Sequence, residues 1–375
     1  LTIDNHKIWS ATGYSAKQEM FKFNKNKNEK TELKAGLLYH KIIRENEELN
    51  IRSEITNFVP PSDDKVELMK VKLINTGKED LKINATSAIP LYGRSADNLR
   101  DHRHVTSLLN TIKTVKNGIE MSPTLSFDER GHKINGLTYM VLGKDDEGNA
   151  PVGFYPTLDD FIGEGGSLTW PKAVVENTDD YSKKGDIFKG QEAVGALRFK
   201  EFKLKPHEEK TFILMIGVTD NDSKINFADK YCDVDSFNKY FEKNKKYWNN
   251  LIDKINFSSG DKEFDNWMKW VTIQPTLRRL FGNSFLPHHD YGRGGRGWRD
   301  LWQDALALLL IEPKSVRDML FNNFAGIRID GSNATIIGSK PGEFKADRNG
   351  INRVWMDHGA WPFLTTKLYI DRSGD

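Results

Sequence analysis

The sequence predicts a protein in which β-structure comes first and helices follow. We expect a large antiparallel β-sandwich over residues 1–222, a helical linker over 223–260 and the opening part of an all-α domain over 261–375. Three observations predict this order. Short alternating runs fill the first part of the chain, the hydrophobic period changes after Asp220, and 375 residues exceed what one hydrophobic core usually holds.

The predicted sandwich depends on runs in which apolar and polar residues alternate. Such runs occur at 66–74, 81–86 and 211–218. A period of two places one row of side chains on a core face, which is typical of antiparallel sheets packed face to face. The turn-forming stretch 75–80, Asn-Thr-Gly-Lys-Glu-Asp, separates two of these runs, so we expect a hairpin there.

Helical spacing begins after the last of these runs. Apolar residues recur every three or four positions over 235–257, and Gly260 ends this predicted helix. Further helices are predicted at 262–281, 298–311, 314–324 and 358–368, with a loop of roughly thirty residues between the last two. Three or four helices cannot close a toroid. We therefore expect a truncated all-α domain, and chain ends at Leu1 and Asp375 that are both cut.

The charge and cysteine content exclude several classes of function. The 55 basic and 53 acidic residues leave a net charge of +2, which is too small and too widely spread for a nucleic-acid or anionic-membrane partner. The single cysteine, Cys232, excludes an internal disulfide framework and fits a reducing compartment. There is no apolar run near the length of a membrane span and no signal-peptide pattern. We therefore expect a cytoplasmic protein.

Residues 285–304 contain the densest group of polar and aromatic side chains. Arg299, Asp300, Gln303 and Asp304 fall at i, i+1, i+4 and i+5 of a predicted helix start, so they lie on adjacent ridges at its N-terminus. Carboxylates and amides bind sugar hydroxyls, tryptophan rings stack on a pyranose, and guanidinium groups bind phosphate. A helix N-terminus also favours an anion. The pattern predicts a sugar and phosphate site, and the alternative is a set of helix caps and surface salt bridges.

Other functions of this segment have less support. The stretch 292–297 follows no convincing strand and lacks the Lys-Ser/Thr pair of a phosphate-binding loop, which argues against a nucleotide site. One Arg-Gly-Gly does not make an RNA-binding segment. The neighbouring His288 and His289 have a poor spacing for metal ligands, and no second pair lies at a suitable distance. We predict no metal site and no cofactor.

A second candidate segment runs from Arg353 to Pro362. Asp357 lies at a loop-to-helix junction, with Trp355 and Trp361 on either side in the sequence. A carboxyl group against aromatic walls loses solvation, so we expect its pKa to be raised, as a general acid requires. The alternative is that Asp357 is the N-cap of the following helix.

The two segments together resemble a known family. Gly-Trp-Arg-Asp-Leu-Trp-Gln-Asp at 297–304 and Trp-Met-Asp-His-Gly-Ala-Trp at 355–361 resemble motifs of the glycoside hydrolase family 94 phosphorylases. The order of sandwich, linker and helices is also similar. The resemblance implies that residues 261–375 are the first part of an (α/α)6-barrel catalytic domain. It also implies an oligosaccharide substrate, inorganic phosphate as co-substrate and a homodimer of the full-length protein.

The resemblance implies a role for each matching residue. Asp357 matches the general acid, and Trp355 matches the tryptophan that lines the donor-glucose subsite. Arg299 and Asp304 match residues that hold the donor glucose, and the arginine is also near the phosphate. The other substrate-binding candidates are Gln303, Asp300 and Trp361, and the weaker candidates for phosphate or acceptor contacts are Arg296 and Arg293.

The motifs also favour one substrate and one mechanism. Gly-Arg-Gly-Gly-Arg-Gly-Trp at 292–298 is most similar to the 1,2-β-oligoglucan branch, and His358 stands where many relatives have an acid, which argues against cellobiose. An inverting hydrolase needs a second carboxylate to activate water, whereas phosphate is already a nucleophile. We predict inverting phosphorolysis that gives α-glucose 1-phosphate. The alternatives are a glucoamylase-like hydrolase and a non-catalytic carbohydrate-binding fragment.

Overall fold

The computed structural model describes residues 1–21, 23, 28–93, 107–128, 131–281, 296–334, 336–337, 344–345 and 357–375. Contacts divide the chain into two compact units, and the division falls within one helix, between Lys245 and Lys246. We call the described residues up to Lys245 the sandwich unit and those from Lys246 onward the helical unit. By packing, residues 223–245 therefore belong with the sandwich.

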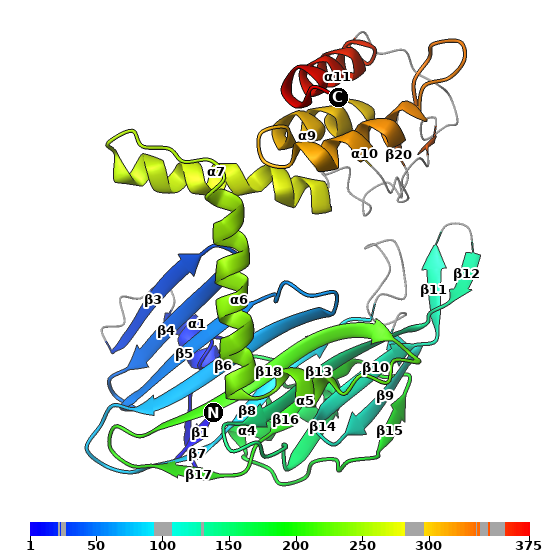
Figure 1. Cartoon of the computed structure of the whole chain (residues 1–375). Helices are drawn as coiled ribbons and strands as arrows, with labels where there is room; N and C mark the ends of the chain where they lie inside the picture. Colours follow the sequence, from blue (N-terminus) through cyan, green and yellow to red (C-terminus); the bar gives the residue numbers. More distant parts are fainter. Residues whose placement is uncertain are drawn as a thin grey trace. The chain divides into compact units, whose positions relative to one another are not determined.

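The main sheet of the sandwich unit is large and entirely antiparallel (Figure 1). Within the described ranges, its nine strands lie in the spatial order β15 (Ile187–Lys189), β9 (Asn110–Val115), β10 (Gly118–Pro123), β13 (Leu137–Asp145), β18 (Glu209–Asp220), β6 (Lys65–Asn75), β5 (Ile51–Phe58), β4 (Tyr39–Asn46) and β3 (Glu29–Gly36). Two of the alternating runs that predicted a β-sandwich form β6 and β18, which are direct neighbours in this sheet.

Two smaller sheets supply the second layer. One contains β17 (Phe202–Leu204), β7 (Leu81–Asn84), β1 (Thr2–Ile3) and β2 (Lys7–Ile8). The other contains β14 (Gly153–Thr157), β16 (Ala193–Arg198) and β8 (Thr86–Leu91). A separate hairpin pairs β11 (Leu125–Asp128) with β12 (Gly131–Ile134), and the short helices of this unit are α1 (Ala16–Phe21), α3 (Leu158–Ile162), α4 (Lys172–Val175) and α5 (Phe227–Tyr231).

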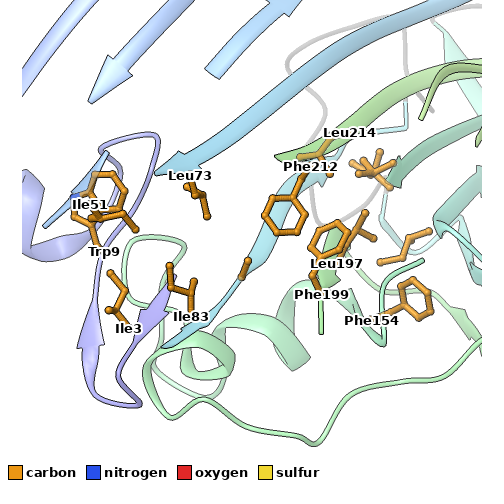
Figure 2. Close-up of a cluster of buried hydrophobic side chains, with 14 of the residues drawn as sticks. Ile3, Trp9, Ile51, Leu73, Ile83, Phe154, Leu197, Phe199, Phe212 and Leu214 are labelled. Carbon is orange, nitrogen blue, oxygen red and sulfur yellow. The ribbon is translucent and has the colours of Figure 1, made fainter. Parts of the chain in front are cut away.

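The main core lies between these two layers. Ile51, Leu73 and Leu214 from the main sheet are buried in one cluster with Ile83 and Leu197 from the second layer (Figure 2). Strand β18 is almost continuously apolar because both of its faces are covered. Its residues 212 and 214 point into this cluster, whereas residues 213 and 215 point to the opposite face, which is also covered. Both faces of the central strands are therefore buried.

Helices cover the opposite face of the main sheet. Phe58 on β5 contacts Phe237 of α6 (Val234–Ile252) edge to face, with ring centroids 5.1 Å apart. Helix α5 begins after Asn226, whose side chain accepts a hydrogen bond from the backbone N–H of Asp229. Cys232 follows α5 and is buried in the same cluster, and this burial raises the pKa of its thiol to about 12. The thiol is therefore protonated at neutral pH.

The prediction of a hairpin at 75–80 was wrong. Strand β6 ends at Asn75 and pairs with β5 and β18, whereas β7 begins at Leu81 and pairs with β1 and β17. The connection therefore takes the chain from the main sheet to the second layer. The Asn75 side chain stabilises it by donating to the carbonyl oxygens of Glu79 (2.7 Å) and Leu204 (3.0 Å). Turn-forming residues indicate that the chain reverses, but they do not indicate which sheet it joins.

The helical unit contains α7 (Lys262–Phe281), α9 (Trp298–Leu308), α10 (Pro313–Phe324) and α11 (Ala360–Ser373). Helix α7 has the predicted bounds, and the Asp261 side chain caps it by accepting from the N–H groups of Glu263 and Phe264. Helix α11 begins and ends later than predicted, and it closes at Gly374, which adopts a left-handed conformation. In the described part of the chain, no helix is long and apolar enough to span a bilayer.

Candidate active site

The predicted site residues of the helical unit gather where the start of α9 meets the turn that precedes α11. The first residue of α9, Trp298, is buried, and its indole N–H donates to the backbone carbonyl of His358 (3.0 Å). Gly326 leaves room for this indole, because a Cβ on residue 326 would lie 2.4 Å from a ring carbon of Trp298. The segment around His358 is thus fixed against the N-terminus of α9.

Asp357 receives two hydrogen bonds on the same carboxylate oxygen. The guanidinium Nη1 of Arg299 lies 3.3 Å from Oδ2, and the indole Nε1 of Trp361 lies 3.1 Å from it. Trp361 is one helical turn beyond Asp357, which places its N–H beside the carboxylate. The side chains of Asp357 and Arg299 are 42% and 53% exposed, so a ligand can reach both.

The expected direction of the Asp357 pKa shift was wrong. The hydrogen bond from Trp361 is the main reason that the pKa of Asp357 lies below its ordinary value, and the Arg299 guanidinium lowers it further. Loss of solvation acts in the opposite direction but is outweighed. The sequence placed aromatic rings near this carboxyl group, but it did not show that an indole N–H would donate to it. Without a ligand, Asp357 is therefore ionised at neutral pH.

The alternative role of Asp357 as a helix cap does not describe this structure. The N-cap of α11 is Gly359, and no side chain makes a capping hydrogen bond there. The backbone carbonyl of Asp357 accepts from Ala360 and Trp361, while its carboxylate bonds to the Trp361 indole and to Arg299. The carboxylate therefore bonds to side chains of α9 and α11 and not to the backbone N–H groups that begin α11.

The other candidate residues on α9 differ in burial, because they lie on different sides of the helix. Asp300 and Gln303 are half-buried, whereas Asp304 is only 1% exposed. Trp298 and Trp302 belong to the hydrophobic core of the unit, so neither is available as a stacking surface for a sugar. They are buried because they lie on the same side of α9 as Leu301, Ala305 and Leu308.

Three predicted residues lie wholly or partly outside the described part of the chain. Trp355 and Arg293 lie outside the described residues. The backbone of Arg296 pairs with Ile337 in a small sheet formed by β19 (Arg296–Gly297), β20 (Ile336–Ile337) and β21 (Phe344–Lys345). This pairing fixes the backbone immediately before α9. Within the described ranges, no group of three His, Cys, Asp or Glu side chains could hold a metal ion.

Sequence reasoning missed two structural roles at this site. Trp298 connects α9 to the turn at His358, and Trp361 donates to Asp357 from one turn away. The second had a visible signal, because a tryptophan four residues after an aspartate lies on the same side of a helix. The site offers a solvent-accessible carboxylate beside a guanidinium, which together can bind a polar or anionic ligand and exchange a proton with it.

The family of this chain is defined by its first part, the β-sandwich. A family model, the supersandwich domain of glycosyl hydrolase 94, matches residues 2–234. The chain belongs to this family. The matched residues include the described strands of the sandwich unit and end at the start of α6, before the candidate site.

The individual proteins that the chain matches have low sequence identity to it. Cyclic β-(1,2)-glucan synthase NdvB of Rhizobium meliloti (strain 1021) is 23% identical over 181 residues, which are 48% of this chain and 6% of the synthase. A structure described as a kojibiose phosphorylase from the human microbiome has 12% identity and a TM-score of 0.43, with 90% of this chain and 42% of that one covered. A bacterial glucoamylase complexed with acarbose has 9% identity and a TM-score of 0.37, with coverage of 92% and 48%. The chain thus spans less than half the length of each of these proteins.

Proposed function

We propose that the chain is part of an inverting phosphorylase that cleaves β-glucosides with inorganic phosphate. The supporting observation is the contact between the carboxylate of Asp357 and the guanidinium of Arg299, two side chains that are 58 residues apart in the sequence and both open to solvent. Membership of the glycosyl hydrolase 94 family supports a carbohydrate substrate. The domain proposal is a sandwich over 1–222, a helical linker over 223–260, of which residues 223–245 pack with the sandwich, and the first part of an (α/α)6 barrel over 261–375.

The proposed reaction needs one acid and one nucleophile. A phosphate oxygen attacks C1 of the terminal glucose from the face opposite the leaving group, and the C1–oxygen bond breaks with inversion. Asp357 gives its proton to the departing glycosidic oxygen. The products are α-glucose 1-phosphate and an oligosaccharide that is one residue shorter. Phosphate is already a nucleophile, so no second carboxylate is required as a base.

The contacts of Asp357 suggest how substrate binding prepares the acid. In the ligand-free site, Trp361 and Arg299 both stabilise the ionised carboxylate and lower its pKa. Phosphate competes for the guanidinium of Arg299, because a guanidinium binds phosphate through paired hydrogen bonds. When Arg299 turns to phosphate, the carboxylate loses one of its two donors and the pKa of Asp357 rises. The carboxylate then takes up a proton from solvent and gives it to the glycosidic oxygen as the C1–oxygen bond breaks.

The remaining candidates have proposed roles around the sugar. Trp355 would line the donor subsite, and Asp300, Gln303, Asp304 and Trp361 would contribute to sugar binding. Asp304 is buried, so its role requires a sugar that is enclosed with it. Arg296 and Arg293 are proposed to contact phosphate or the acceptor.

A 1,2-β-oligoglucan is the proposed substrate. The relative with 23% identity is a cyclic β-(1,2)-glucan synthase, which supports this linkage. A cytoplasmic location, a homodimer of the full-length protein, and the absence of a cofactor, a nucleic-acid partner and a membrane partner complete the proposal.

One assay separates the phosphorylase from its alternatives. The full-length protein is incubated with α-glucose 1-phosphate and each of four acceptors, namely glucose, sophorose, cellobiose and laminaribiose, and phosphate release is measured. Release with sophorose and not with cellobiose supports the proposal. Release of free glucose from a β-glucan without phosphate would identify a hydrolase. Binding of a glucan with neither reaction would identify a carbohydrate-binding protein.

A further inference from the structure

The sandwich unit contains a polar cavity that is separate from the candidate active site. Its volume is about 470 Å³, which is within the usual range for pockets that hold small molecules. Its wall comes from the N-terminal segment, α1, β3 and β4. The lining residues that matter for its chemistry are Trp9, Tyr14, Gln18, Glu29, Arg44 and Asn46.

Glu29 organises this wall. One carboxylate oxygen accepts from Gln18 Nε2 (2.8 Å) and Arg44 Nη1 (3.1 Å). The other accepts from Trp9 Nε1 (3.3 Å) and Asn46 Nδ2 (3.4 Å). Four donors from three parts of the chain are therefore held in fixed positions around one carboxylate. The wall is pre-organised, which reduces the ordering cost of binding a ligand.

Arg44 lies against the backbone at Gly13. This glycine has a φ of +79°, and a Cβ there would lie 2.3 Å from the central carbon of the Arg44 guanidinium. Both the conformation and the close approach therefore require glycine. The Nε–H of Arg44 is buried and has no hydrogen-bond partner in the described part of the chain. The close contact with Gly13 and the hydrogen bond to Glu29 hold the guanidinium in one position at the cavity wall.

The charges and rings of the cavity limit what it can bind. Lys17 and Arg44 face Glu19, Glu29 and Glu48, so the acidic groups are in slight excess and an anion such as phosphate is disfavoured. An adjacent cavity of about 320 Å³ is lined mainly by apolar side chains and shares Trp9 and Tyr14 with the polar cavity. The polar cavity differs from it in having charged groups and amides, such as Gln18. An apolar ligand would leave those groups unpaired.

Aromatic surface remains available beside the polar wall. The ring of Tyr14 is 54% exposed, and Phe21 on α1 also lines the cavity with an exposed ring. Fixed amide and guanidinium groups beside exposed rings suit a ligand with hydroxyl groups on its edge and C–H groups on its face. We propose that this cavity is a second carbohydrate-binding site, which holds a neutral saccharide of one or two hexose units away from the residues proposed for catalysis.

The test uses the full chain with an Arg299→Ala substitution, which weakens the candidate active site and leaves the sandwich unchanged. Sophorose, cellobiose and glucose are titrated at millimolar concentrations and followed by calorimetry and by the indole N–H resonance of Trp9. The expected result is saturable binding of at least one sugar, with a shift of the Trp9 resonance. Tyr14→Ala should weaken this binding at least tenfold. Tyr92→Ala, which removes a tyrosine of similar exposure outside the cavity, should leave it unchanged.

Three results would overturn the proposal. They are the absence of saturable binding for all three sugars, equal affinity of the Tyr14→Ala variant, and an equal loss with Tyr92→Ala. Gln18→Ala provides a second change of the wall, and far-ultraviolet circular dichroism verifies that each variant is folded. The outcome does not depend on phosphorolysis, because binding here can succeed or fail whether or not the Asp357 site is active.

Discussion

The sandwich unit and the helical unit differ in how they place their large apolar side chains. In the sandwich unit, the exposed large apolar side chains are scattered over loops and strands, and they include Leu33, Val59 and Tyr92. In the helical unit, they recur along single helices. On α7 they are Phe264, Trp267 and Trp270, and on α11 they are Phe363, Leu364, Leu368 and Ile370.

This difference shows how far each unit buries its own apolar surface. Isolated apolar side chains on a surface are normal, but a row of aromatic rings along one helix is typical of a surface that another surface covers. The sandwich unit buries both faces of its main sheet with its own residues. In the helical unit, α9, α10 and α11 share one core, while α7 and α11 leave such rows exposed. We therefore expect stability to depend mainly on the sandwich, and chemistry mainly on the helical unit.

The largest predicted effect follows from changing the proposed acid. Asp357→Asn keeps the shape of the side chain but cannot deliver a proton, so kcat/KM for phosphorolysis should fall by about 10²- to 10⁴-fold. The melting temperature should stay the same, because this side chain is partly exposed. Asp318→Asn is the matched control, since Asp318 is exposed on α10 of the same unit. Full activity of Asp357→Asn would remove this residue from the mechanism.

The sequence predicted the sandwich well because the period of two directly reflects side chains on alternate faces. It predicted both ends of α7 because Gly260 and the apolar spacing gave local signals. It failed at residues 75–80, where the partner strand is set by distant contacts. It also left Trp298 and Trp302 open to a role as ligand residues, because a tryptophan near glycines and arginines looks the same whether it faces a core or a cleft.

The candidate site was predicted in part. The pairing of Arg299 with Asp357 joins two segments that were singled out independently by composition. The sign of the Asp357 pKa shift was missed because it depends on which atom of a neighbouring ring faces the carboxylate. Spacing showed that Trp361 would be close, but only the structure shows its N–H directed at Oδ2.

The second effect concerns the sandwich core. Leu214→Ala removes a side chain buried between the layers (Figure 2), and the cavity left behind should lower the free energy of unfolding by roughly 2–5 kcal/mol. Leu33→Ala on the exposed edge strand β3 should change it by less than about 0.5 kcal/mol. Urea denaturation followed by circular dichroism measures both. Similar losses for the two variants would mean that the core is not where the stability of this unit resides.

A smaller effect is predicted for the donor to the acid. Trp361→Phe keeps an aromatic ring but removes the N–H that helps to lower the pKa of Asp357. The pKa of the acid should rise, so the alkaline limb of the pH profile of kcat/KM should move to higher pH. The lowered pKa of Asp357 also has a consequence for folding stability. The free energy that the ionised carboxylate contributes to folding is fully present above the pKa of Asp357 in the unfolded chain. It is lost as the pH falls through the lower pKa of the folded protein. Trp267→Phe on α7 is the control. An unchanged alkaline limb in Trp361→Phe would show that this indole does not tune the acid.

The smallest predicted effect tests the exposed row on α7. Trp267 is 57% exposed, so Trp267→Gln should change the free energy of unfolding by less than about 0.5 kcal/mol while reducing the binding of an apolar fluorescent dye to the full chain. Trp302→Gln, at a fully buried position on α9, should instead be strongly destabilising, because it places an amide in the core. A loss above about 1 kcal/mol for Trp267→Gln would mean that this ring is covered in solution. The two units would then bury their large apolar side chains to the same degree. The distinction between a sandwich that provides stability and a helical unit with exposed apolar rows would not hold.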